Sequence, residues 1–141
     1  MKISAKGRYG LAAMVFLARI GQANSPTTIL TISENLGISK IYLEQVFSLL
    51  KHARLVTSSK GSQGGYHLAR AAQEITAWDV LAAIELPLTE KAGPATGDAQ
   101  EDLEQALTNC VYDPLDAAIR QSLQGVNLCA ILEEADRQKS K

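Results

Sequence analysis

The chain has 141 residues, with 14 Lys and Arg against 15 Asp and Glu, and aromatic residues make up only 5% of it. This length suits one domain with a real hydrophobic core, and the scarcity of aromatic residues beside plentiful Ala and Leu favours a mainly helical fold. No apolar run approaches the roughly 20 residues that cross a bilayer, and the two cysteines, Cys110 and Cys129, form neither a disulfide framework nor a CxxC metal pattern. We therefore expect a cytoplasmic protein with no membrane segment, no bound metal and no cofactor.

The net charge of −1 conceals two halves of opposite sign. Up to Ile75, nine basic residues, Lys51 and Arg54 among them, outweigh three acidic residues, a balance of +6. The remainder holds five basic and twelve acidic residues, a balance of −7. Because attraction to phosphate is electrostatic and local, a basic half joined to an acidic half predicts a DNA-binding module with a separate assembly or sensing module.

A first helix is predicted from Ser4 to about Ile20, followed by a turn over residues 21–26. Basic residues precede the apolar part of this helix, as they do in a signal peptide. Arg19 ends the apolar run after eight residues, so we expect a helix face and not a signal peptide.

A helix-turn-helix is predicted next. Leu30, Ser33 and Leu36 share one face of its first helix, and Gly37 is suited to the left-handed conformation that ends a helix. Ser39 is a natural cap for the second helix, whose polar first turn is typical of a recognition helix that faces base edges in the major groove. The buried stripe expected on this second helix is Tyr42, Leu43, Val46, Phe47 and Leu50.

Two short β-type runs follow, at residues 55–57 and 65–68. Gly61 and Gly64 between them, together with Gly65 at the start of the second run, permit the backbone angles of a tight, protruding loop. A helix-turn-helix followed by such a hairpin is a winged helix, and this pattern predicts DNA binding.

The second half is predicted to be helical apart from one loop. Thr76 caps a helix over Ala77–Glu85, and a flexible loop occupies residues 86–100. In the helical stretch that follows, Asp113 is expected to be an N-cap where the helix restarts or kinks at a proline. Asn127 is expected to cap a last helix.

The helices after residue 101 carry an apolar stripe that the DNA-binding part does not cover. The simplest cover is the same stripe in a second subunit, so we expect a homodimer. The fold class is mainly α with a small β-wing, divided into a winged-helix DNA-binding domain (1–85), the loop (86–100) and a helical dimerisation or effector region (101–141). The dimerisation stripe comprises Leu107, Leu115, Ile119 and Leu123.

Four segments resemble the Rrf-two family of bacterial winged-helix transcription regulators: MKISAKGRYGLAAM, ISKIYLEQVFSLLKHARLV, KGSQGGYHLAR and EITAWDVLAAIE. The resemblance is specific over residues 1–85 and collinear to about Leu132. It implies a homodimer in which a long C-terminal helix crosses between subunits. It also implies recognition helices that enter successive major grooves of a palindrome, and wings that reach the minor groove.

By position, the resemblance implies base contacts from the first turns of the second helix, and it puts Lys60 where many members have a wing arginine. Lysine keeps the charge but loses the flat fork that suits a narrow groove. With the basic residues near the N-terminus added, the expected DNA-contacting set is Lys2, Lys6, Arg8, Ser39, Lys40, Tyr42, Glu44, Gln45, Lys60 and Gln63.

Cluster-binding members of this family resemble one another in having three closely spaced cysteines after the helix that here contains Trp78. Residues 86–106 of this chain contain no cysteine: Ala106 lies about where the third would be, and Asn109 lies near the position of a further ligand. One thiol, Cys110, does not supply the four ligands that an iron–sulfur cluster requires. We therefore expect a member without the usual cluster.

Three functions remain open: a dimeric repressor with an unknown small-molecule or protein effector, a redox-responsive repressor that uses the Cys110 thiol, and a helical interaction protein that binds no DNA. An enzyme is not expected, because no Ser/His/Asp set, carboxylate pair or metal spacing appears. The glycines of residues 61–65 also lack the lysine and the helix of a phosphate-binding loop.

Overall fold

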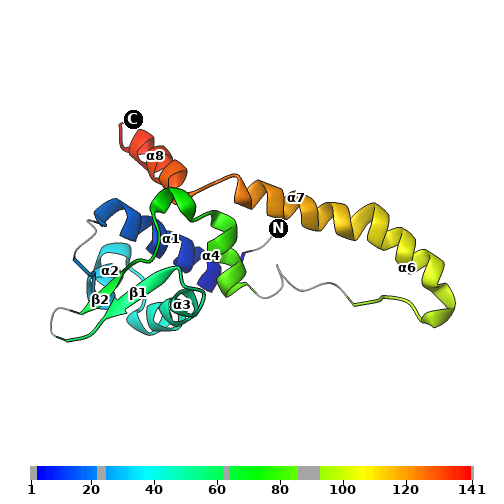
Figure 1. The fold of residues 1–141 in the computed structure, drawn as a ribbon, viewed down its shortest axis with the longest axis horizontal. Coiled ribbons are helices and arrows are strands. Elements are labelled where there is room, and N and C mark those ends of the chain that lie inside the picture. The colour runs from blue at the N-terminus through cyan, green and yellow to red at the C-terminus, as the bar shows by residue number, and fades with distance from the viewer. Residues whose placement is uncertain (1–2, 22–24, 62–63, 86–92, 141) are drawn as a thin grey trace.

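The computed structural model describes residues 3–21, 25–61, 64–85 and 93–140. Lys2 and Gln63 of the expected DNA-contacting set lie outside these residues, as does part of the expected loop. Figure 1 shows a body that contains the wing and most of the helices, and an arm that projects from it. In chain order the elements are α1 (Ala5–Ile20), α2 (Ile29–Leu36), α3 (Lys40–His52), β1 (Val56–Ser59), β2 (Gly65–Leu68), η1 (Ala72–Glu74), α4 (Ala77–Ile84), η2 (Asp98–Gln100), α6 (Glu101–Leu107), the π-helical turn η3 (Thr108–Tyr112), α7 (Asp113–Gln124) and α8 (Leu128–Lys139).

The core of the body lies where α1, α3 and α4 meet, since each of these helices contacts the other two. Met14, Phe47 and Val80 are fully buried there. The two strands form an antiparallel pair in which Val56 lies opposite Leu68 and Ser59 lies opposite Gly65. A mainly helical fold with a small β-wing is therefore confirmed.

Several helix ends follow directly from local sequence. The Ser4 hydroxyl accepts a hydrogen bond from the Gly7 N–H at 3.1 Å at the start of α1. Thr76 and Asp79 form a reciprocal capping box at the start of α4, with bonds of 3.0 and 3.1 Å. Asn127 accepts from the N–H of Ala130 at 2.8 Å and so caps α8. The expected caps at Thr76 and Asn127 are thus confirmed, and α1 begins one residue after its expected start at Ser4.

The buried faces of α2 and α3 differ in part from those expected from the sequence. Leu30 is 55% exposed, and the fully buried residue of α2 is Ile32. Tyr42 is 44% exposed and so lies beside the buried stripe of α3 instead of within it. In both cases helical spacing identified a face, but which side of an eight- or thirteen-residue helix meets the core depends on how the neighbouring helices cross it.

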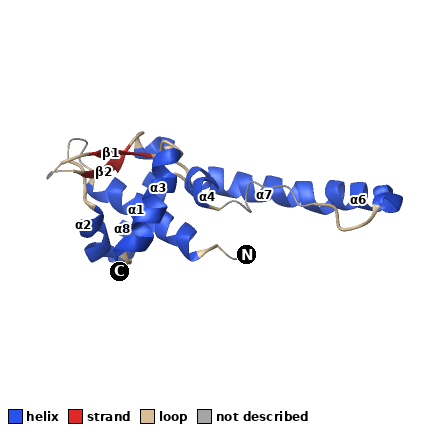
Figure 2. Ribbon diagram, turned by 90° about the horizontal axis from the view of Figure 1, so that it is seen from below, coloured by secondary structure: helices blue, strands red, loops and turns tan. Residues whose placement is uncertain are grey.

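α6, η3 and α7 run on as one continuous helical arm, and Figure 2 shows it extending away from the body. The expectation that Asp113 is an N-cap is wrong, because its backbone is helical, with φ −64° and ψ −46°. Pro114 lacks the N–H that an α-helical hydrogen bond requires. The π-helical turn η3 lies just before it and already changes the α-helical hydrogen-bond pattern there, so the chain accommodates the proline. The helix therefore passes through the proline without a restart.

α8 returns to the body, although the expected division put it with the arm. Leu128 is fully buried in the core cluster of the body, and α8 contacts both α1 and η1. Two backbone bonds hold the start of α8 in place, from the Ala77 N–H to the Val126 carbonyl at 2.8 Å and from the Leu128 N–H to the Ile75 carbonyl at 2.9 Å.

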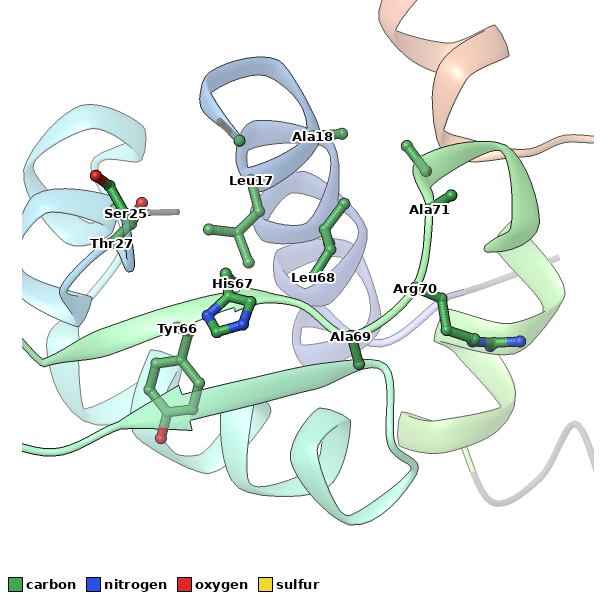
Figure 3. Close-up of a pocket in the computed structure, with 12 residues that line it drawn as sticks. Leu17, Ala18, Ser25, Thr27, Tyr66, His67, Leu68, Ala69, Arg70 and Ala71 are labelled. Atoms are coloured by element: carbon green, nitrogen blue, oxygen red, sulfur yellow. The ribbon is translucent and has the colours of Figure 1, made fainter. Parts of the chain in front are cut away.

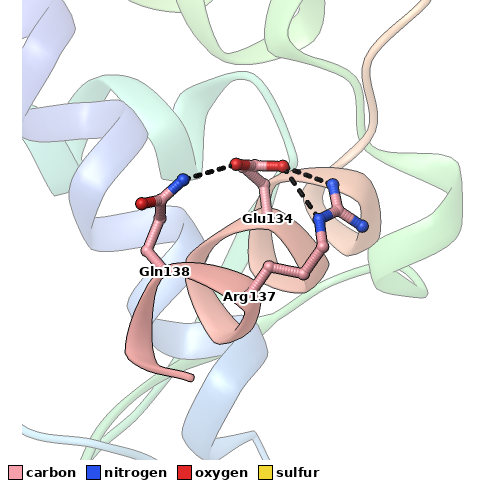
Figure 4. Close-up of polar contacts among 3 residues, drawn as sticks. All are labelled: Glu134, Arg137 and Gln138. Carbon is pink, nitrogen blue, oxygen red and sulfur yellow. Dashed lines mark hydrogen bonds and ion pairs between the residues drawn. The ribbon is translucent and has the colours of Figure 1, made fainter. Parts of the chain in front are cut away.

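The polar side of α8 carries a small network of its own (Figure 4). Glu134 accepts hydrogen bonds from Arg137 Nε at 3.1 Å and from the Gln138 amide at 2.7 Å. The hydrogen bonds from Arg137 lower the pKa of the Glu134 carboxyl, and the same carboxylate raises the pKa of the Arg137 guanidinium. Both groups therefore stay ionised on this solvent-facing side of the helix.

We predict that Leu128→Ala lowers the free energy of unfolding by about 2–5 kcal/mol, because it leaves a cavity in the core. Urea denaturation followed by circular dichroism, at one fixed protein concentration, measures the change. The control is Leu30→Ala, which removes the same atoms from a side chain that is 55% exposed and should shift stability by no more than about 0.5 kcal/mol. Equal losses in the two variants would contradict the packing of α8 on the body.

Candidate nucleic-acid interface

The turn between α2 and α3 is closed by backbone geometry that Gly37 supplies. Gly37 has φ +68°, in the left-handed region, and its N–H donates to the Ser33 carbonyl at 2.9 Å. The Ser33 hydroxyl donates to the Ile38 carbonyl at 2.6 Å, and the Ile38 side chain is buried beneath the turn. These bonds fix the direction in which α3 leaves the turn.

The start of α3 is open to solvent. Ser39 occupies the cap position, but its side chain makes no capping hydrogen bond. The expected cap position is therefore confirmed and the expected cap bond is not. An uncapped helix start leaves N–H groups free to meet an anion such as a backbone phosphate. Lys40, Glu44 and Gln45 are also exposed on the first turns.

Tyr42 links this open end of α3 to α1. Its ring meets that of Tyr9 edge to face, with centroids 5.5 Å apart and an interplanar angle of 77°. Lys6 lies three residues before Tyr9, on the same side of α1, and both Lys6 and Arg8 are exposed. The aromatic pair thus brings the side of α1 that carries Lys6 to the start of α3.

The wing is fixed to the same core. Tyr66 of β2 packs on Phe47 of α3, with ring centroids 4.6 Å apart. Tyr66 also exchanges two backbone hydrogen bonds of 2.8 Å with Thr27, just before α2. Gly65 makes this approach possible, since a Cβ on it would lie 2.5 Å from the Thr27 carbonyl atoms. The wing and the recognition helix are therefore held in one arrangement.

A basic groove of about 520 Å³ runs along the β1 side of the wing. Lys51, Arg54 and Lys60 supply its cations, and all three are exposed. Arg54 takes a left-handed backbone, φ +62°, immediately after α3. Lys51 and Arg54 were missing from the expected contact set; their only signal in the sequence was their contribution to the +6 charge of the first half.

A second cavity, of about 330 Å³, lies on the other side of the wing between α1 and β2 (Figure 3). Leu17, Ala18 and Leu68 line it with apolar atoms. The charged side chain among its described lining residues, Arg70, turns toward α4 and pairs with Asp79 at 3.6 Å. The cations that an anionic ligand could contact therefore lie in the basic groove and not in this cavity.

An exposed, uncapped recognition helix, a wing locked to it by aromatic packing and a basic groove at the wing's edge define a DNA-binding transcription regulator of the winged helix-turn-helix class. The family model for Rrf2, described as an iron-dependent transcriptional regulator, matches residues 3–134. The chain belongs to this family, which confirms the Rrf-two resemblance, and it is not an enzyme.

Known transcription regulators resemble this chain in sequence and in fold. The transcriptional regulator IscR of Vibrio campbellii is 37% identical over 144 residues, covering 98% of this chain and 84% of that protein. The structure of T. potens IscR matches with a TM-score of 0.73 and 31% identity, over 96% of this chain and 88% of that one. The structure of CymR, the global cysteine regulator of B. subtilis, matches with a TM-score of 0.75 and 30% identity, over 95% and 98%.

The chain has few donor atoms that suit the iron in the family's description. Cys110 is exposed on the arm, and Cys129 is half-buried on α8. Asn109, beside Cys110, accepts a hydrogen bond from the Gln105 amide at 2.9 Å. Within the described ranges, no three His, Cys, Asp or Glu side chains come together in a way that could hold a metal ion. The residues present do not suit an iron–sulfur cluster, which needs four ligands.

We predict that the recognition helix and the wing fail differently when mutated. Gln45→Ala or Glu44→Ala should relax base preference by about 1–3 kcal/mol at the bases these residues read. Lys60→Ala should weaken binding to all sequences alike and reduce the dependence of log affinity on log salt by about one for each subunit, because it removes a phosphate contact.

Fluorescence anisotropy with matched and mismatched duplexes over a salt series measures both quantities. Lys139→Ala, which removes an exposed lysine from the far end of α8, is the control and should change neither. Equal, sequence-independent losses at Gln45, Glu44 and Lys60 would mean that the helix positions the protein without reading bases.

Proposed function

We propose that the protein is a cytoplasmic homodimeric repressor that binds a palindromic operator. The start of α3 would read the major groove, and the wing with its basic groove would hold the neighbouring backbone. The observation that carries this proposal is that the first turns of α3 and the cations Lys51, Arg54 and Lys60 are exposed together. The packing of Tyr66 on Phe47 fixes α3 and the wing relative to each other. Both surfaces serve to bind DNA, so the mode of action that they support is repression by occupying the operator.

The arm supports the dimer part of the proposal. Its apolar side chains are exposed: Leu103 is 50%, Leu107 37%, Val111 47% and Leu115 55% accessible. An α-helix turns by about 100° per residue, so four-residue steps alone would carry Leu115 about 120° around the helix from Leu103. The π turn between them inserts about one extra residue and takes back most of that rotation. Leu103, Leu107 and Leu115 therefore share one side of the arm, as a helical interface requires.

The base of the arm is attached to the body. The Arg120 guanidinium of α7 lies 4.8 Å from the centre of the Trp78 ring on α4. Ile119 and Leu123 lie near this end and are half-buried within the subunit. In the proposed dimer, the exposed outer part of the stripe would supply most of the contact with the second subunit. An arm with a firm base and an exposed apolar side suits a contact with a second copy.

We predict that Leu115→Glu dissociates the dimer, because it puts a charge in the centre of an apolar interface. Analytical ultracentrifugation at micromolar concentration measures the state. Ala117→Glu, which adds the same charge to an exposed residue on the other side of α7, is the matched control and should leave the dimer intact. Affinity for DNA should fall with Leu115→Glu only.

The decisive experiment for the function as a whole is binding to DNA from upstream of its own gene, in a gel shift with and without reductant. Retardation of that DNA, with excess unrelated DNA present, supports the proposal. A wild-type protein that is monomeric at micromolar concentration, or that shows no preference among sequences, would contradict it.

We further propose that the protein carries no resident cluster and that Cys110 is not a sensor. Protein purified without oxygen should then contain no stoichiometric iron and no visible cluster absorbance. Cys110→Ser should leave operator affinity unchanged under reducing and mildly oxidising conditions, with Cys129→Ser as the matched control. The exposure of Cys110 on the arm favours one rival, a thiol-based redox repressor. Loss of a redox-dependent change in binding in Cys110→Ser, without iron in the wild type, would establish that rival.

A further inference from the structure

Ile41 is the most exposed large hydrophobic residue in the part of the chain that the structure describes, with 69% of its surface accessible. It is the second residue of α3, in the first turn of the recognition helix. By contrast, Leu43, Val46 and Leu50 of the same helix are fully buried. Packing within the subunit therefore makes little use of the Ile41 side chain.

The neighbours of Ile41 on the helix surface are polar. Residues three and four positions apart are adjacent on a helix, and these positions hold Glu44 and Gln45, both exposed. Ile41 is thus an isolated apolar side chain within the polar face of α3, at the end of the helix where a helix-turn-helix contacts base edges.

We propose that Ile41 reads the 5-methyl group of a thymine in the major groove. This inference rests on the proposed function and names one chemical group in the operator. Thymine is the base that presents an apolar group at its major-groove edge, so it is the natural contact for an exposed aliphatic side chain among polar readers.

The spacing of the helix also locates the thymine. Side chains of Ile41 and Gln45 lie about 5–6 Å apart on the helix surface, and successive bases on one strand lie roughly 3.4 Å apart along the duplex. The thymine is therefore one or two steps from the base that faces Glu44 or Gln45. A cytosine or adenine amino group at that place would meet Ile41 without a hydrogen-bond partner, which disfavours those bases.

The experiment begins with the full-length protein and a random pool of DNA duplexes, from which the bound sequences are selected. The selected duplex is then made with thymine or with uracil, which lacks the methyl group. Uracil should weaken binding about fourfold for each contacted methyl, and about 15-fold for a site with two half-sites. Fluorescence anisotropy measures both dissociation constants.

Variants assign the effect to Ile41. Ile41→Ser should bring the ratio of thymine to uracil affinities close to one and should select sites without the preferred thymine, whereas Ile41→Val should keep most of the wild-type ratio. Leu49→Ala is the matched control, because it shortens another exposed apolar side chain of α3 two turns further on and should leave the ratio unchanged.

Two results would overturn the inference alone: a selected site bound equally well with thymine and uracil, or a ratio that Ile41→Ser leaves unchanged. If Ile41→Ser alters the oligomeric state while the ratio stays the same, Ile41 is a protein contact and the inference is again overturned. Failure of the wild type to select any common sequence would overturn the proposed function and this inference together.

Discussion

The burial of one side of α3 is the constraint on which the rest of the DNA-facing structure depends. Leu43, Val46 and Phe47 are fully inside the core, and a helix with a polar opposite side can bury only one face. The opposite side, with Glu44 and Gln45, must then point outward.

The same packing also sets the wing. Phe47 extends the buried side of α3 to Tyr66 on β2, and Tyr66 is paired through its backbone with Thr27 before α2. The second helix of the helix-turn-helix, the hairpin and the segment that leads into α2 are therefore joined at one aromatic pair. A substitution of Phe47 would displace α3 and the wing together, whereas a substitution of Lys60 would alter the wing alone.

The acidic half of the chain is divided between the arm and the body. The first turn of α6 is acidic, with Glu101, Asp102 and Glu104, which disfavours contact between the arm and DNA. α8 belongs to the acidic half by sequence but to the body by packing, and its last turn holds Arg137 and Lys139.

Within the described residues, no helix is long and apolar enough to cross a membrane.

Local features of the structure could be predicted from the sequence by itself. The ends of α1, α4 and α8 are set by Ser4, Thr76 and Asn127, whose side chains bond to backbone only three residues away. Gly37 ends α2 for a different local reason, because glycine readily takes the left-handed backbone conformation found there. The family resemblance, the winged helix and the exposure of the first turn of α3 could all be inferred before any contact was known.

Other features were decided only by the tertiary structure. Helical spacing does not tell that Ile32 and not Leu30 is buried, that Tyr42 lies against Tyr9, or that Arg54 joins Lys51 and Lys60 in one groove. Nor does it tell that α8 returns to the body. Periodicity and caps involve residues within a few positions of each other, whereas these contacts join segments far apart in the chain and depend on the angles at which whole helices cross.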